Sequence, residues 1–248
     1  MKILLPPSET KRAGGDGPPI MPHALALPVL APLREAAMDA LSALAQDEDS
    51  AARILKLGPR QLGDIAHNGT LRTAPTMPAA DRYTGVLYDA LDAQTLDVAA
   101  RRWLAEHVLI HSAPFGPVGA LDPLPMYRLA AGTALPGVPP LRRHWAEATT
   151  AAIADADPSF VLDLRSEAYV ALGPVPESVP SAYVRVVTDR GRALNHFNKK
   201  AKGALVRALA EDRPEAVTGE QLRDWAAGRG IRLRTTPEKE IWELIVPA

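Results

Sequence analysis

The sequence predicts a mixed α/β or α+β fold in a single domain that spans residues 1–248. Three observations support this prediction. Short apolar runs alternate with longer amphipathic stretches along the chain, no shift of composition marks a domain boundary, and no internal repeat is present. A chain of 248 residues is long enough to bury a substantial core. We therefore expect short strands and helices packed around one core.

In the first half of the chain, helices predominate. The apolar run 2–5, which ends at Pro6-Pro7, predicts a buried strand, and a Gly/Pro-rich loop follows at 13–22. Apolar stripes predict helices at 32–45, 60–68 and 96–106, with a short helix inside 81–91. Ser50 is expected to cap a further helix that carries Ile54 and Leu55.

In the second half of the chain, strands become frequent. Apolar runs and alternating patterns predict strands at 108–111, 160–164, 182–187, 228–233 and 241–246. Repeated Gly and Pro predict a loop at 113–125. Helices are expected at 141–154 and 196–209.

Composition excludes several classes of protein. The chain has no cysteine, so disulfides, thiolate nucleophiles and iron–sulfur clusters are excluded, and its six scattered histidines predict no metal site and no cofactor. Neither a P-loop nor a G-x-G-x-x-G element is present. No signal peptide and no apolar run near the length of about 18 residues needed to span a bilayer is present, so we expect a cytoplasmic protein without a membrane partner.

Positive charge is concentrated in the predicted helix 196–209, HFNKKAKGALVRAL, although the net charge of the chain is only -1. At 100° per residue, an apolar side is expected to hold Phe197, Ala201, Ala204, Leu205 and Ala208. The opposite side is expected to hold Lys199, Lys200, Lys202 and Arg207, and Arg190 and Arg192 precede it. Three explanations remain open: a solvated helix face, a surface for phosphates, or the charged wall of a pocket.

The stretch LKLGPRQLGDIA, residues 55–66, loosely resembles a helix-hairpin-helix. In that motif a Gly-rich hairpin presents backbone N–H groups to a DNA phosphate without reading the base sequence. Gly58 is the candidate donor. An ordinary connection between two helices is the alternative.

Several segments in collinear order resemble the YaaA family of peroxide stress proteins. They are ILLPPSETK at 3–11, YTG at 83–85, SAPFGPVGALDPLPMYRL at 112–129, Trp145, LDLRSEAY at 162–169 and FNKKAKG at 197–203. The resemblance covers nearly the whole chain. It implies a single compact domain with a mixed β-sheet flanked by helices, a positively charged cleft and a helix-hairpin-helix-like element. It also implies binding to duplex and irregular DNA, in a role that limits damage by peroxide and intracellular iron.

Two functional hypotheses follow. The first is sequence-tolerant DNA binding through the phosphate backbone, with Arg190, Arg192, Lys199, Lys200, Lys202, Arg207 and Gly58 as contacts. The second is an enzyme for a small anionic or nucleotide-like substrate, for which the catalytic candidates are Ser8, Lys11, Arg128, Glu167 and Lys199. The pocket candidates are Tyr83, Thr84, Gly85, Tyr127, Ser166, Tyr169 and Asn198. A scaffold protein without a ligand is a third possibility, and the sequence does not decide whether the protein is an enzyme.

Overall fold

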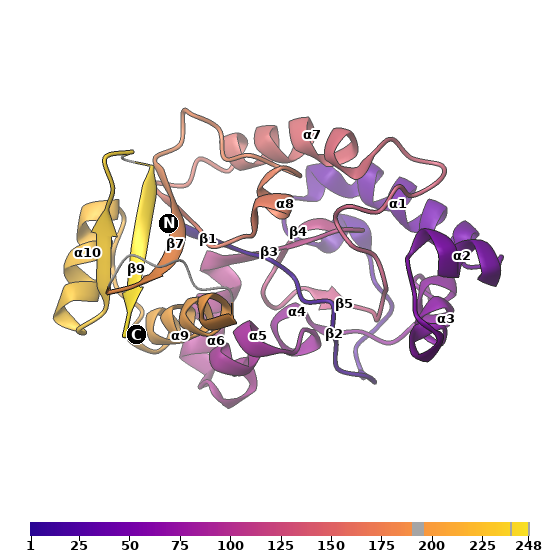
Figure 1. Cartoon of the computed structure of the whole chain (residues 1–248), viewed down its shortest axis with the longest axis horizontal. Coiled ribbons are helices and arrows are strands. Elements are labelled where there is room, and N and C mark those ends of the chain that lie inside the picture. The colour runs from indigo at the N-terminus through magenta and orange to yellow at the C-terminus, as the bar shows by residue number, and fades with distance from the viewer. Residues whose placement is uncertain (190–195, 239, 248) are drawn as a thin grey trace.

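A mixed β-sheet crosses the centre of the molecule (Figure 1). The computed structural model describes residues 1–189, 196–238 and 240–247, and of His196 and Phe197 it describes only the backbone. Within these residues the sheet has seven strands, in the order β4 (Gly116–Gly119), β3 (Val108–Ser112), β1 (Lys2–Leu5), β6 (Val161–Asp163), β7 (Ser181–Thr188), β9 (Ile241–Val246) and β8 (Arg232–Thr235). Neighbouring strands are parallel from β3 to β9, and the edge strands β4 and β8 are antiparallel to their neighbours.

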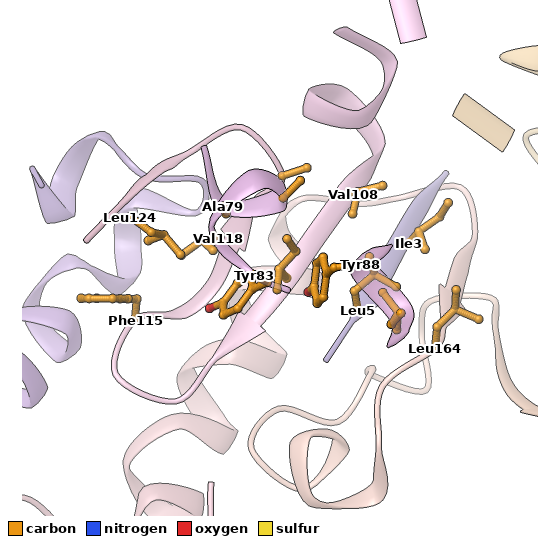
Figure 2. Close-up of a cluster of buried hydrophobic side chains, with 14 of the residues drawn as sticks. Ile3, Leu5, Ala79, Tyr83, Tyr88, Val108, Phe115, Val118, Leu124 and Leu164 are labelled. Carbon is orange, nitrogen blue, oxygen red and sulfur yellow. The ribbon is translucent and has the colours of Figure 1, made fainter. Parts of the chain in front are cut away.

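Three neighbouring strands of the sheet, β3, β1 and β6, are buried on both faces. Strands β1, β3 and β6 are almost continuously apolar, which is typical of parallel strands covered on both sides. Figure 2 shows the core at this point, where Ile3 and Leu5 of β1 lie in one cluster with Tyr83 and Tyr88. The predicted mixed α/β fold in a single compact domain is confirmed.

Helices cover both faces of the sheet. On one side, α9 (His196–Asp212) contacts both α5 (Val86–Leu91) and α6 (Val98–His107), and α7 (Leu141–Asp155) lies on the other side (Figure 1). At one end of the molecule α10 (Gly219–Gly228) packs on β8. At the opposite end, α1 (Ala31–Leu44), α2 (Glu48–Ile54) and α3 (Asp64–Gly69) contact one another.

Short elements complete the fold. They are the 3-10 helices η1 (Pro22–Ala24), η2 (Pro28–Leu30), η3 (Pro59–Gln61) and η4 (Ala93–Thr95), the short helices α4 (Ala79–Arg82) and α8 (Glu167–Val170), and the antiparallel pair β2 (Met77–Pro78) and β5 (Pro123–Leu124). In the described part of the chain, no helix combines the length and the apolar character required to cross a membrane.

Two local predictions were wrong, and one helix was not predicted. The segment 113–125 is not only loop, because it contains β4 and β5; an edge strand tolerates Pro117 since only one of its sides bonds to the sheet. The helix expected to start at Ser50 is capped by Asp47, whose side chain accepts a hydrogen bond from the Ser50 N–H. Helix α10 was not predicted, although Thr218 and Gln221 form a capping box at its start.

The predicted sides of α9 were wrong in part. Leu205 is buried and Lys199 and Lys200 are exposed as expected, but Lys202 is buried and Ala204 is exposed. A Cβ on Gly203 would lie 2.0 Å from the Leu87 carbonyl oxygen, so α5 and α9 approach each other closely at this glycine. This crossing turns the side of α9 that carries Lys202 towards the interior. The side chain of Phe197 lies outside the described residues.

Candidate functional site

A cavity of about 740 Å³ opens at the carboxyl ends of β1 and β6. These strands are neighbours, but the chain leaves β1 towards β3 on one side and leaves β6 towards β7 on the other. Such a reversal leaves a crevice above the sheet, where open α/β folds place their ligands. We call this cavity the switch-point pocket.

Segments that are distant in sequence meet in the switch-point pocket. Its walls come from 6–10, 84–88, 129–132, 166–169 and the first turn of α9. The predicted site residues among the lining residues are Ser8, Thr84, Gly85, Ser166, Tyr169 and Lys199. Lys11, Tyr83, Tyr127, Arg128, Glu167 and Asn198 are not among them. Of these, Glu167 is exposed beside Ser166, and the buried Oδ1 of Asn198 has no hydrogen-bond partner among the described residues.

The loop after β1 is held tightly against Gly85. The hydroxyls of Ser8 and Thr10 are 3.2 Å apart, and Thr10 Oγ1 donates to the Thr84 carbonyl at 3.3 Å. Gly85 has φ +93°, and a Cβ there would lie 3.3 Å from the Thr10 hydroxyl oxygen. The left-handed backbone and the close hydroxyl both favour glycine at this position. The loop therefore presents hydroxyl groups to the cavity in a fixed arrangement.

Buried tyrosines support this loop from below. The hydroxyls of Tyr83 and Tyr127 are 2.7 Å apart, and Ser112 donates to Tyr127 at 3.0 Å. Tyr88 donates to the Pro6 carbonyl at 2.7 Å, which fixes the end of β1. Burial raises the pKa of Tyr83, Tyr88 and Tyr127, so all three phenols are neutral. They act as packed rings with satisfied hydroxyls.

The ammonium group of Lys11 lies over the rings of Tyr83 and Tyr127. Its Nζ donates to the carbonyl oxygens of Ser8 at 3.1 Å and Glu9 at 3.2 Å, and it lies 4.0 Å from the centre of the Tyr127 ring. Burial and, to a smaller extent, the nearby charge of Arg128 lower the pKa of Lys11 to about 7, while Asp64 and Glu9 act in the opposite direction. Lys11 therefore closes the loop that forms the pocket rim.

Arg128 is positioned by its main chain. Its N–H donates to Asn68 Oδ1 at 2.8 Å, and Asn68 Nδ2 donates to its carbonyl oxygen at 2.9 Å. Its guanidinium donates to Glu9 Oε2 at 3.2 Å. Glu9 lines the switch-point pocket, so Arg128 lies directly behind a pocket residue. We call Glu9, Lys11 and Arg128 the rim cluster.

A second group of charges is buried at the end of β6. Arg165 makes three hydrogen bonds to the Asp163 carboxylate and donates to His111 Nδ1 at 2.9 Å. Lys202 Nζ donates to the Leu164 carbonyl at 3.0 Å. We call Asp163, Arg165, His111 and Lys202 the buried cluster.

Burial governs the protonation of the buried cluster. A guanidinium can only donate, so His111 Nδ1 accepts and the ring hydrogen of its neutral form is on Nε2, which has no hydrogen-bond partner in the described part of the chain. Burial and the charge of Arg165 hold the pKa of His111 well below its usual range. Burial also lowers the pKa of Lys202 to about 8, although Asp163 opposes this shift. Asp163 and Arg165 were not among the predicted site residues, although the segment LDLRSEAY contains both.

The cations proposed to contact DNA are in different environments. Lys199 and Lys200 are exposed and form no ion pair with a described acidic residue. Lys202 is 5% exposed, so the prediction that it lies on the polar side of the helix is wrong. Arg207 donates to main-chain oxygens of Leu91 and Asp92 and pairs with Glu211 at 2.9 Å. Arg190 and Arg192 lie outside the described residues.

The predicted hairpin forms a turn between α2 and α3. Lys56 has φ +54°, and the Gly58 N–H donates to Gln61 Oε1 at 3.1 Å. The N–H group expected to face a phosphate is therefore already bonded within the hairpin. Figure 1 shows the hairpin at one end of the long axis and α9 in the other half of the molecule.

A further cavity of about 800 Å³ lies at the amino ends of β6, β7 and β9, next to α10. None of the predicted site residues lines it. No group of three or more histidine, aspartate and glutamate side chains within the described ranges is arranged to hold a metal ion. The switch-point pocket is thus the cavity in which the predicted residues meet.

Comparison with known proteins identifies the family. A family model described as peroxide stress protein YaaA matches residues 1–230. The chain belongs to the YaaA family of peroxide stress proteins. A UPF0246 protein of Corynebacterium efficiens is 42% identical over 252 residues, which cover 99% of this chain and 100% of that protein. A UPF0246 protein of Streptomyces coelicolor is 42% identical over 214 residues, which cover 84% of this chain and 82% of that protein.

The similarity extends to more distant relatives. An uncharacterized protein of Campylobacter jejuni is 27% identical over 217 residues, or 86% of this chain and 85% of that protein. The family resemblance drawn from the six segments is therefore confirmed, and family membership supports a role in peroxide stress.

Proposed function

We propose that the protein binds a small anionic molecule with an apolar part in the switch-point pocket, as its contribution to the peroxide stress response. The observation that supports this most is the convergence of Ser8, Thr84, Ser166, Tyr169 and Lys199 on one cavity at the point where the strand order reverses. A cavity of about 740 Å³ has the size of small-molecule sites.

The lining groups match such a ligand. Lys199 supplies a positive charge, the hydroxyls of Ser8 and Ser166 supply hydrogen bonds, and Leu87 and Leu129 supply apolar walls. A nucleotide has the corresponding parts, because it joins a flat apolar base to a phosphate. The pocket is therefore better suited to a nucleotide-like anion than to a fully polar one such as sulfate.

Adjacent lysines provide a matched test. Lys199 lines the pocket, whereas Lys200 is also exposed but does not line it. With adenosine monophosphate as the probe, calorimetry is expected to show that Lys199→Ala weakens binding about tenfold and that Lys200→Ala leaves it unchanged. Equal losses in the two variants, or no binding to the wild-type protein, would contradict the proposal.

Sequence-tolerant DNA binding is the second candidate. It is favoured by the exposure of Lys199 and Lys200 on one helix turn, without ion pairs to described acidic residues. These two lysines would neutralise backbone phosphates, and Arg190 and Arg192 precede them in sequence. The net charge of -1 restricts such binding to this local patch.

The same two variants separate the candidates. If the lysines contact phosphates, each change to Ala reduces the salt dependence of binding to a labelled duplex by about one unit of slope. Fluorescence anisotropy across a sodium chloride series measures this slope. Equal reductions of the slope in both variants would support DNA binding by this pair of lysines, whereas unchanged slopes would exclude it.

A further inference from the structure

The ion pair between Glu9 and Arg128 joins two side chains in very different surroundings. The Arg128 side chain is only 16% exposed, whereas the Glu9 side chain is 73% exposed. A single contact at 3.2 Å joins them. Exposed pairs of this kind contribute little to stability, since water competes for the carboxylate. Among the described residues, Glu9 is the one carboxylate within ion-pair distance of Arg128.

The two partners also differ in how firmly they are held. Asn68 bonds to both the N–H and the carbonyl of Arg128, so the main chain that carries the guanidinium is fixed. The backbone carbonyl of Glu9 is held by Lys11, but among the described residues Arg128 is the one partner of its carboxylate. The Glu9 side chain can therefore rotate away while the loop keeps its shape.

Rotation of Glu9 alone would leave Arg128 without its counterion, whereas Lys11 would keep the nearby charge of Asp64. Lys11 and Arg128 are close enough for each to oppose the charge of the other, and Glu9 offsets this repulsion. Another anion is then needed in the same place. An acidic group of a molecule in the pocket is well placed to supply it, because Glu9 is itself a lining residue.

We propose that Glu9 is a displaceable internal counterion, and that a carboxylate or phosphate of the pocket ligand replaces it on Arg128. This inference rests on the proposed small-molecule function and narrows it. The ligand carries its acidic group at the end that reaches Arg128 and its apolar part against walls such as Leu129. Glu9 then disfavours neutral molecules, because they cannot compensate the Arg128 charge that is unpaired once Glu9 leaves.

Two fluorescent probes that differ in one acidic group test the proposal. 8-Anilinonaphthalene-1-sulfonate is an anion with an apolar body, and N-phenyl-1-naphthylamine has the same body without the sulfonate. Glu9→Gln removes the competing carboxylate and is expected to bind the anionic probe about tenfold more tightly. Its affinity for the neutral probe is expected to stay the same. Glu147→Gln, which removes another exposed carboxylate on α7, is the matched control.

Arg128 variants complete the test. Arg128→Gln is expected to weaken binding of the anionic probe about tenfold and to leave binding of the neutral probe unchanged. In the double variant, it is expected to abolish the increase in affinity that Glu9→Gln causes. Retained binding of the neutral probe shows that Arg128→Gln is folded, and Arg128→Lys should restore part of the anionic affinity.

The possible outcomes distinguish the two proposals. Suppose that both probes bind, but that Glu9→Gln does not raise the affinity for the anionic probe, or raises it as much when Arg128→Gln is also present. The counterion proposal is then wrong and the pocket proposal stands. If neither probe binds the wild-type protein, and adenosine monophosphate does not bind either, both proposals are wrong.

Discussion

The buried cluster and the rim cluster each contain an arginine paired with a carboxylate, but they differ in how completely those charges are satisfied. In the buried cluster, Arg165 is fully buried and bonds to both oxygens of Asp163. In the rim cluster, Arg128 meets one oxygen of a mostly exposed Glu9. The two arginines differ little in sequence context, since each follows a short hydrophobic stretch.

This difference separates structural charges from available ones. Removing one partner of a buried pair leaves an uncompensated charge without water, so the buried cluster is expected to stabilise the fold. An exposed carboxylate exchanges its partner for water or a ligand at little cost. The following four predictions, ordered by expected size, test this distinction.

The largest effect is expected at Asp163. Asp163→Asn leaves Arg165 and Lys202 without the negative charge that both face, so we expect the free energy of unfolding to fall by about 3–5 kcal/mol. Urea unfolding followed by tryptophan fluorescence measures this change. A loss below about 1 kcal/mol would show that the buried cluster resembles a surface pair.

The second prediction concerns pH and Lys202. The pKa of Lys202 is about 8 in the folded protein, whereas an ordinary lysine, as in the unfolded chain, has a pKa of 10.5. Between these two pH values the unfolded chain binds more protons than the folded protein, so the free energy of unfolding rises with pH. Compared with Lys202→Met, the wild-type protein should gain about 2–3 kcal/mol between about pH 7 and pH 10. Urea unfolding of both proteins across this range is the measurement, and a constant difference would contradict the lowered pKa.

The third prediction concerns Asn68, which is fully buried and fixes the main chain of Arg128. Asn68→Ala leaves an N–H and a carbonyl of Arg128 without their partner, which is expected to cost about 1–3 kcal/mol. Asn68→Asp keeps the acceptor and should lose less. Both variants should bind the anionic probe more weakly relative to the neutral probe. An unchanged ratio of the two affinities would show that Asn68 does not position Arg128.

The smallest effect on stability is expected at the rim. Glu9→Gln removes an exposed, single-contact ion pair, so the free energy of unfolding should change by less than about 1 kcal/mol. Thermal unfolding of Glu9→Gln and of Asp163→Asn at neutral pH compares the two losses of stability directly. A loss as large as that of Asp163→Asn would remove the distinction between the two clusters.

Much of the fold followed from local pattern. Strands β1, β3 and β7 and helices α1, α6 and α7 were predicted near their observed positions, because runs of apolar residues with period two or 3.6 depend only on nearby residues. Strand β4 was missed because its Gly and Pro are typical of loops, and only pairing with β3 makes it a strand. Helix α10 was missed although its capping box was visible in the sequence.

The candidate site was predicted in part. Ser8, Thr84, Ser166 and Lys199 were selected individually, and their meeting in one cavity depends on the order of strands in the sheet, which no single segment encodes. The pairing of Asp163 with Arg165 was not predicted, because the segment that contains them was interpreted only through its resemblance to a family motif. The two residues lie two positions apart, and only the tertiary structure shows that both are buried.

The sequence by itself determined the fold class, the family and the absence of thiol chemistry, because composition, periodicity and collinear motifs are properties of the chain alone. Only the tertiary structure decided which cations are available. Lys199 and Lys202 are three positions apart on one helix, yet the first lines a pocket and the second is buried. The close approach of α5 at Gly203 rotates the helix, and that rotation fixes which ammonium group meets solvent.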